Sequence, residues 1–192
     1  MRDSGQIPPG PPRRARSKKA IKEIARGIKL LILDVDGVLT DGRIILDDEG
    51  NEYKAFHVRD GHGIKMLIRA GMQVAIITGR FSKVVERRAH ELGITEVFQK
   101  CFNKTSAYHH LIEKYSLSGE EVAYIGDDIV DVPLMAKVGL PVTVSDADGY
   151  VKKFALFVTE RRGGRGAVRE VTDVILKSKG LWERILNEYF ET

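Results

Sequence analysis

The chain has 192 residues, which fits one domain large enough to bury a core. Hydrophobic residues make up 43% and charged residues 30%, as in ordinary globular proteins, and the single cysteine excludes an intramolecular disulfide. The net charge of +4 is uneven, because residues 1–27 hold eight Lys and Arg and only two acids, which leaves the rest of the chain slightly acidic.

Residues 1–19 contain four closely spaced prolines and an arginine-rich run, with no apolar segment after them. This composition predicts a solvated extension that is not a secretory signal, and contact of this tail with nucleic acid or an acidic surface is the less favoured alternative. Residues 20–27 add at most a short helix, so residues 1–27 are assigned as a disordered basic, Pro-rich extension. The apolar run Leu30–Leu33 ends at Asp34, far short of the roughly 18 residues of a membrane span, and a cytoplasmic location is expected.

From residue 28, short apolar runs alternate with segments of helical periodicity. Strands are predicted at Leu30–Val35, Val74–Thr78, Val97–Phe102, Val122–Ile125, Val142–Val144 and Leu156–Val158. Helices are predicted at Ile64–Ala70, Ser82–Leu92 and Thr105–Tyr115, after Ile125 through Lys137, and at 167–178. The alternation predicts an α/β domain over residues 28–180, with a three-layer, Rossmann-like parallel sheet covered on both faces.

One segment interrupts this alternation between the first strand and the first helix. Arg43–Leu46 and Glu52–Val58 flank Asp47–Asn51, which is rich in turn formers, so a β-hairpin is predicted, too short to act as a cap domain. Its apolar side chains need burial, and a neighbouring subunit is a suitable place; they are Ile44, Ile45, Tyr53 and Phe56. Residues 181–192 are predicted to form a short amphipathic C-terminal helix.

Polar residues follow the predicted strands at the points where the strands end. Asp34 and Asp36 follow the first strand, Thr78 closes the second, and Asp127 follows Val122–Ile125, while Lys104 begins a helix. Because the carboxyl ends of parallel strands meet at one edge of a sheet, we expect these groups to converge. Carboxylates that repel one another need a cation, and an oxygen-only ligand set favours Mg²⁺, which also binds substrate phosphate.

The spacing of Asp34 and Asp36 places both carboxylates on one side of the extended chain, where they can flank one reacting centre. We expect Asp34 to attack phosphorus and form an aspartyl-phosphate. Asp36 is expected to protonate the leaving oxygen and then to accept a proton from the hydrolytic water. Thr78 and Lys104 are expected to bind the transferring phosphoryl oxygens.

Four segments of the chain resemble, in order, the four motifs of the haloacid dehalogenase superfamily. They are Asp34-Val35-Asp36-Gly37-Val38-Leu39-Thr40, Thr78-Gly79-Arg80, Lys104 and Gly126-Asp127-Asp128. Three further segments resemble the 3-deoxy-D-manno-octulosonate 8-phosphate phosphatases within it: Val58-Arg59-Asp60-Gly61, Ile76-Ile77-Thr78-Gly79-Arg80 and Gly163-Gly164-Arg165-Gly166-Ala167-Val168-Arg169-Glu170. The resemblance covers roughly residues 28–178.

This resemblance implies a Mg²⁺-dependent phosphomonoesterase without a cap domain, which releases the sugar acid that links lipid A to the core of lipopolysaccharide. It also implies a homotetramer in which the hairpin and the Gly-rich tail of one subunit help to close a neighbour's site. The implied metal ligands are the side chains of Asp34 and Asp127 and the backbone carbonyl of Asp36. The implied substrate contacts are Asp36, His57, Val58, Arg59, Asp60, Gly61, Lys65, Arg80, Arg88 and Lys104.

Two of these residues depart from the family pattern, because His57 stands where Asn is common and Lys65 where Arg is common. Lysine keeps the charge of arginine but loses its bidentate geometry for a carboxylate. The segment Gly163–Gly166 is expected to be flexible enough to fold over an anionic substrate.

Three other functions stay open: hydrolysis of a nine-carbon keto-deoxy sugar acid 9-phosphate, a phosphotransferase or mutase on the same fold, and a non-enzymatic binding protein. The last would be expected if Asp34 or Asp36 were missing, and both are present. Asp128 and Asp131 either steady the metal shell or cap a helix, and His62 lies close to the predicted site in sequence.

Overall fold

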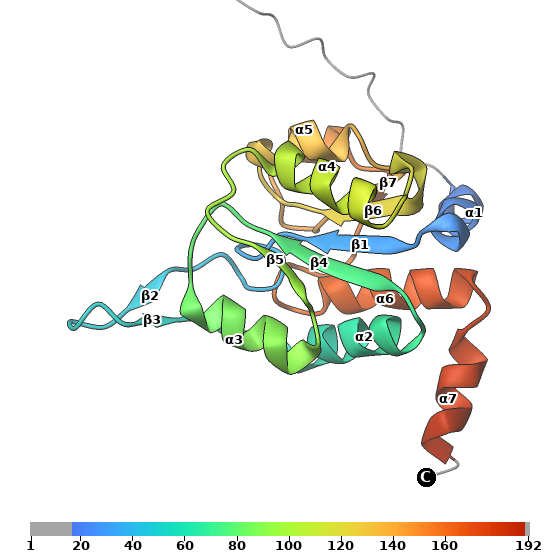
Figure 1. The fold of residues 1–192 in the computed structure, drawn as a ribbon, viewed down its shortest axis with the longest axis horizontal. Coiled ribbons are helices and arrows are strands. Elements are labelled where there is room, and N and C mark those ends of the chain that lie inside the picture. The colour runs from blue at the N-terminus through green and yellow to red at the C-terminus, as the bar shows by residue number, and fades with distance from the viewer. Residues whose placement is uncertain (1–16, 191–192) are drawn as a thin grey trace, which may run out of the picture.

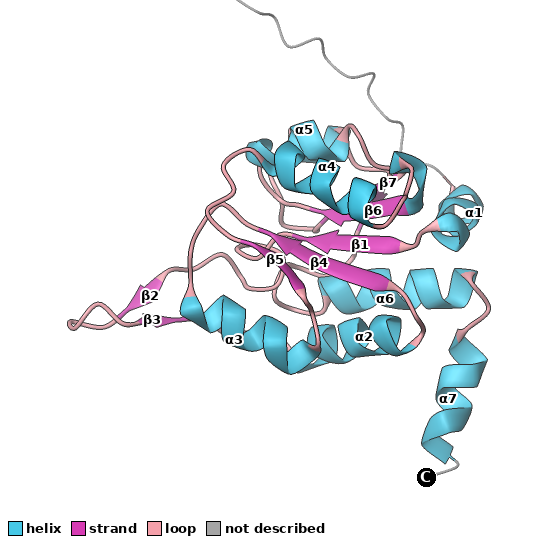
Figure 2. Ribbon diagram, in the orientation of Figure 1, coloured by secondary structure: helices cyan, strands magenta, loops and turns pink. Residues whose placement is uncertain are grey.

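The computed structural model describes residues 17–190, which form a six-stranded sheet covered by helices on both faces (Figures 1 and 2). The strand order is β5-β4-β1-β6-β7-β8, and every pairing in this sheet is parallel. The strands are β1 (Leu30–Leu33), β4 (Gln73–Ile77), β5 (Glu96–Phe98), β6 (Val122–Ile125), β7 (Leu140–Thr143) and β8 (Phe157–Val158). The predicted α/β fold with a parallel sheet is therefore confirmed.

Helices α4 (Lys104–Lys114) and α5 (Val132–Met135) cover one face of the sheet, and α2 (Val58–Arg69), α3 (Lys83–Leu92) and α6 (Ala167–Ser178) cover the other (Figure 2). Strand β1 supplies both cores, because successive side chains of a strand point to opposite faces. Leu31 and Leu33 pack in the core beneath α2 and α6, while Leu30 and Ile32 pack beneath α4. All four are fully buried, which explains why β1 is a continuous apolar run.

In the part of the N-terminal extension that the structure describes, a helix lies where the sequence allowed a short helix at residues 20–27. Ser17 caps the start of helix α1 (Lys18–Gly27), because its side chain accepts a hydrogen bond from the Ala20 backbone N–H. Ile21 and Ala25, four residues apart, are buried in the main core, which joins α1 to the domain. The expectation of disorder for residues 1–16 falls outside the described residues.

The hairpin is present, but its strands are shorter than predicted: β2 (Ile45–Leu46) pairs antiparallel with β3 (Glu52–Tyr53) and projects from the domain (Figure 1). Helix α2 begins at Val58, so the predicted strand through Val58 and the predicted helix start at Ile64 are both wrong. Glycine is a poor helix former, and its presence in this first part of α2 is explained by the close packing of α6 against α2. A Cβ atom on Gly63 would lie 2.3 Å from the Thr172 hydroxyl of α6.

Two further elements differ from the prediction. Strand β5 ends at Phe98, and the chain turns at Lys100, whose φ is 55°. The helix predicted through Lys137 consists of a 3₁₀ turn, η2 (Ile129–Asp131), followed by α5. Two more 3₁₀ turns, η1 (Gly119–Glu121) and η3 (Val151–Lys153), precede β6 and β8, and the predicted C-terminal helix is α7 (Trp182–Phe190). Between residues 17 and 190, no helix is long and apolar enough to cross a membrane.

Candidate active site

A pocket of about 390 Å³ lies at the carboxyl ends of β1, β4 and β6, beside the first residue of α4. Its lining includes Asp34, Asp36, Thr78, Lys104 and Asp127, which the sequence predicted to converge, and also Arg80, an implied substrate contact. The lining also includes Gly42, Gly79, Cys101, Phe102, Asp128 and Val130. The arrangement follows from the topology, because β1 lies at the centre of the sheet between β4 and β6.

Asp34 stands directly after β1, and its backbone N–H donates to the carbonyl of Ile125 on β6 at 3.0 Å. Its Oδ1 accepts from the Val35 N–H at 2.7 Å, and its Oδ2 lies 2.8 Å from the Lys104 Nζ. Burial is the main influence on the pKa of Asp34 and raises it to about 6, although the Lys104 ammonium acts in the opposite direction. Asp34 is therefore a buried carboxylate aimed at the pocket and steadied by a cation.

Asp131 holds the centre of a buried polar network behind the pocket. Its Oδ1 accepts from the Lys104 Nζ and from the Tyr124 hydroxyl, both at 2.6 Å. Its Oδ2 accepts from the backbone N–H groups of Asp127 and Asp128 at 2.9 and 3.1 Å. Asp131 therefore fixes both Lys104 and the loop that carries Asp127. Sequence reasoning left its role open and missed Tyr124, whose only signal was a phenol inside an apolar strand.

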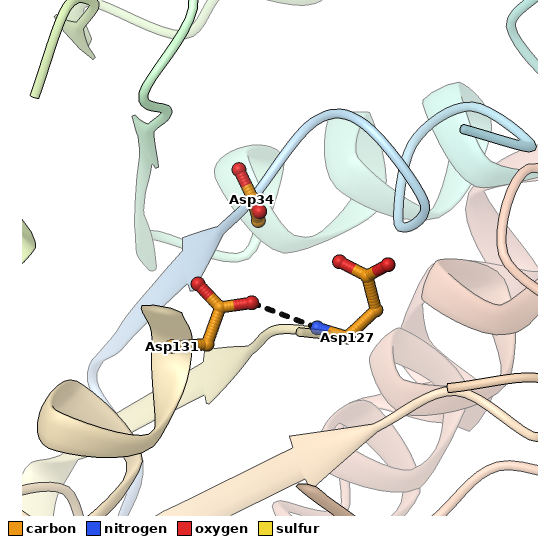
Figure 3. A group of neighbouring side chains, drawn as sticks. All are labelled: Asp34, Asp127 and Asp131. Carbon is orange, nitrogen blue, oxygen red and sulfur yellow. Dashed lines mark hydrogen bonds between the residues drawn. The ribbon is translucent and has the colours of Figure 1, made fainter. Parts of the chain in front are cut away.

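Carboxylate oxygens of Asp34, Asp127 and Asp131 all lie within 4.8 Å of one another. Figure 3 shows the three side chains gathered at this place. Burial first, and then the charges of Asp34 and Asp131, raise the pKa of Asp127 to about 7. An all-oxygen cluster whose ionisation is opposed by its own charges suits a hard divalent cation such as Mg²⁺. Because Asp131 already accepts four hydrogen bonds, Asp34 and Asp127 are the members of this group that could hold a metal ion.

Gly37 makes this close arrangement possible. Its φ of +85° lies in the left-handed region, and a Cβ atom there would sit 2.0 Å from the Asp127 Oδ2. Any other residue would displace the Asp127 carboxylate from the cluster. The sequence predicted a tight turn at Gly37, and the structure adds a second reason for glycine.

The Asp36 side chain points to a different set of partners. Its Oδ1 forms an ion pair with Lys54, and its Oδ2 lies 3.6 Å from the Arg80 Nε. Arg80 also pairs with Glu52, at 3.0 Å. Lys54 and Glu52 come from the hairpin and were not among the predicted site residues. Their spacing of two residues, which places both side chains on one side of an extended chain, was the available signal.

Several residues predicted to contact substrate do not line this pocket. Val58, Arg59 and Lys65 are exposed on α2, and His57 is half-buried at its start. Arg88 lines a second cavity of about 310 Å³, together with Phe56, Val58, Val84, Arg87 and Glu91. Phe56 packs against the core of its own chain, so its predicted need for a neighbouring subunit is wrong.

Asp60 and Gly61 are buried, and Asp60 has a structural partner that explains its burial. Its carboxylate accepts hydrogen bonds from the backbone N–H groups of Gly166 at 3.1 Å and Arg169 at 2.7 Å. These donors lie at the start of α6, where an anion is favoured. The structure therefore gives Asp60 the role of capping α6, and its contact with substrate stays a prediction.

The Gly-rich segment is not the flexible flap that the sequence suggested. The Gly164 N–H donates to the Val38 carbonyl at 2.9 Å. A Cβ atom on Gly163 would lie 1.7 Å from the Gly37 carbonyl oxygen, and one on Gly164 would lie 2.4 Å from the Thr40 carbonyl carbon. Residues 163–164 therefore pack backbone to backbone against the loop after Asp34 and Asp36, where only glycine leaves enough space.

Residues 81–170 match the family described as haloacid dehalogenase-like hydrolases. The chain is 53% identical over 152 residues to the 3-deoxy-D-manno-octulosonate 8-phosphate phosphatase of Yersinia pestis. The matched region covers 79% of this chain and 81% of the relative. A crystal structure of that phosphatase from Yersinia pestis matches with a TM-score of 0.84 at 50% identity, over 85% of this chain and 88% of that one.

A crystal structure of the phosphatase of the same name from Moraxella catarrhalis holds a magnesium ion, a phosphate ion and a KDO molecule. It matches with a TM-score of 0.87 at 39% identity and covers 89% of this chain and 98% of that one.

Proposed function

The chain belongs to the haloacid dehalogenase-like hydrolase family and is a phosphoric monoester hydrolase, and from this premise we propose that it hydrolyses 3-deoxy-D-manno-octulosonate 8-phosphate. The products are the free sugar acid and inorganic phosphate. The observation that carries the proposal is the convergence of Asp34, Lys104 and Asp127 in one pocket, in a chain that is about half identical to phosphatases named for this substrate.

In the proposed reaction, an oxygen of Asp34 attacks phosphorus while the bond from phosphorus to the sugar oxygen breaks. Asp36 gives a proton to the departing oxygen. It then takes one from the water that attacks phosphorus, and the bond from phosphorus to Asp34 breaks. Lys104, which is 2.8 Å from Asp34, and Thr78 stabilise the phosphoryl oxygens from the base of the pocket. Asp131 and Tyr124 keep the Lys104 ammonium in place.

The cofactor is Mg²⁺, and the residues that would hold it are Asp34 and Asp127, with the backbone carbonyl of Asp36 as a further proposed ligand. When bound, the ion neutralises negative charge so that a carboxylate can approach a phosphate. The shifted pKa of Asp127 supports this assignment, because the carboxylates resist ionisation when no cation is present.

Phosphate release from a panel of phosphomonoesters in the presence of Mg²⁺ tests the proposal. We expect turnover of the eight-carbon sugar-acid phosphate to exceed that of small neutral sugar phosphates, and Asp34→Asn to abolish it. A Glu113→Gln variant, which removes an exposed carboxylate near the end of α4 that lies away from the pocket, is the matched control and should keep full activity. Wild-type turnover by Asp34→Asn would refute the nucleophile.

The same panel separates the alternatives. A preference for the nine-carbon sugar acid 9-phosphate would retain the proposed chemistry and change the substrate. This substrate is the alternative because His57 and Lys65 depart from the family pattern. Phosphate transfer to an added sugar or alcohol in place of water would indicate a phosphotransferase. The absence of activity on every phosphomonoester would refute the proposed substrate and mechanism together.

The assembly that we propose is a homotetramer in which the hairpin of one subunit covers the pocket of a neighbour. Ile45, Leu46 and Tyr53 of the hairpin are exposed, and so are Phe102 and Val130 at the pocket. Exposed apolar side chains at both places are suited to mutual burial. The cytoplasmic location expected from the sequence stays a prediction.

A further inference from the structure

Lys54, which follows strand β3 of the hairpin, has a buried ammonium group. Its side chain is 1% exposed, and its Nζ pairs with the Asp36 Oδ1 and lies 3.4 Å from the Glu52 Oε1. An ammonium removed from water is stable only with anionic partners. The predicted mechanism uses Asp36 but gives Lys54 no role.

The four charged groups form a closed ring. Lys54 and Arg80 are the cations, Asp36 and Glu52 are the anions, and each cation contacts both anions. Glu52 and Lys54 are two residues apart in extended chain, so both face the domain, whereas Tyr53 between them is exposed. The ring therefore ties the base of the hairpin to the loop after β1.

The two oxygens of Asp36 have unequal surroundings within this ring. Lys54 occupies Oδ1, whereas the Arg80 Nε at 3.6 Å from Oδ2 is beyond hydrogen-bond distance. Asp36 lines the pocket, and Lys54 does not. The ion pair with Lys54 therefore holds Oδ1 of Asp36 from outside the pocket and leaves Oδ2 available to the pocket.

We propose that Lys54 is a positioning residue for Asp36, holding Oδ1 so that Oδ2 exchanges the proton with the leaving oxygen and then with water. The inference deepens the proposed phosphatase function and rests on it. Asp36 enters the first step protonated on Oδ2, by the proton that the second step of the preceding turnover supplies. It gives that proton to the sugar oxygen as the oxygen–phosphorus bond breaks, and it is left as the carboxylate that Lys54 pairs with. In the second step a proton returns to Asp36 from the water whose oxygen bonds to phosphorus, and the bond to Asp34 breaks.

This role predicts that removal of Lys54 affects only reactions that need Asp36 as an acid. A sugar hydroxyl is a poor leaving group and requires a proton, whereas p-nitrophenolate departs without one. The ratio kcat/KM reports the steps through leaving-group departure. A variant with a misplaced Asp36 should therefore lose kcat/KM on the sugar phosphate and keep most of it on p-nitrophenyl phosphate.

The experiment compares wild type, Lys54→Met and Lys137→Met on both substrates with Mg²⁺. Methionine keeps the length of lysine without its charge, and Lys137 is an exposed control on the loop before β7. General acid catalysis typically contributes 10²- to 10⁴-fold, so we expect Lys54→Met to lose at least about tenfold in kcat/KM on the sugar phosphate and less than about threefold on p-nitrophenyl phosphate. Lys137→Met should match wild type on both.

Glu52→Gln is a second test that leaves Lys54 in place and removes one of its two anionic partners, which covers the case in which Lys54→Met fails to fold. It should show the same selective loss at smaller size. Equal losses on both substrates, or unchanged kcat/KM on both, would overturn the positioning role while the phosphatase function stands. A wild-type protein inactive on both substrates would instead refute the proposed function on which the inference rests.

Discussion

Replacing Asp127 by Asn should stabilise the metal-free protein at neutral and higher pH. The folded chain raises the pKa of Asp127 from its ordinary value of 3.8 to about 7, through burial first and then the charges of Asp34 and Asp131. At a pH between 3.8 and about 7, Asp127 retains a proton in the folded chain that it has lost in the unfolded chain. The free energy of unfolding therefore falls as pH rises through this window, and the full cost is present above about pH 7.

The magnitude follows from the size of the shift. One pH unit between the folded and unfolded pKa values corresponds to about 1.4 kcal/mol, so ionised Asp127 costs the folded state at most about 4 kcal/mol. Solvent screening of this incompletely buried carboxylate lowers the figure, and we expect about 1–3 kcal/mol. Asparagine avoids the cost because it carries no charge, but it also removes a proposed Mg²⁺ ligand.

Urea unfolding of wild type and Asp127→Asn at pH 5 and pH 8, with and without Mg²⁺, measures both effects. In chelator, the variant should gain stability relative to wild type between pH 5 and pH 8. Mg²⁺ at pH 8 should stabilise wild type but not the variant. Glu113→Gln is the control and should follow wild type throughout. A variant whose stability difference from wild type does not change with pH would refute the electrostatic reasoning, and equal stabilisation by Mg²⁺ would refute the ligand assignment.

Two further predictions concern the support of the site. Gly163→Ala should lower kcat by roughly 10²-fold, the typical effect of a shift of about 1 Å in catalytic groups, because its Cβ would lie 1.7 Å from the Gly37 carbonyl oxygen. Gly149→Ala, which meets no atom within 4 Å, should retain wild-type turnover, and equal kcat for the two variants would contradict the prediction. Ile45→Asp should break the proposed tetramer into smaller species, measured as a lower molar mass by light scattering, and should lower turnover at the same time. A wild-type protein that is monomeric by light scattering would contradict this prediction.

The sequence alone predicted the sheet and the residues at its carboxyl edge. Apolar runs of strand length, each followed by polar groups, identified Asp34, Thr78 and Asp127 as neighbours, because parallel strands bring their carboxyl ends to one edge. All three line the pocket. Such a prediction succeeds because the positions of residues directly after a strand depend on the backbone path alone.

Element boundaries were less predictable where tertiary contacts outweigh local preference. Helix α1 lies in a segment assigned to a disordered extension, because Ile21 and Ala25 gain burial against a distant part of the chain. The glycines at the start of α2 disfavour a helix on their own, yet Gly63 lies on α2 where the approach to Thr172 leaves no space for a side chain.

The roles of individual side chains depended on the tertiary structure. Asp60 and Asp131 are both buried carboxylates, but one caps α6 and the other orients Lys104. Lys54 reaches Asp36 from the hairpin, 18 residues along the chain. The sequence determined which chemical groups are available and at which strand ends they lie. Only the folded structure decided their partners, because hydrogen bonds and ion pairs depend on distances between segments that the spacing of residues along the chain does not define.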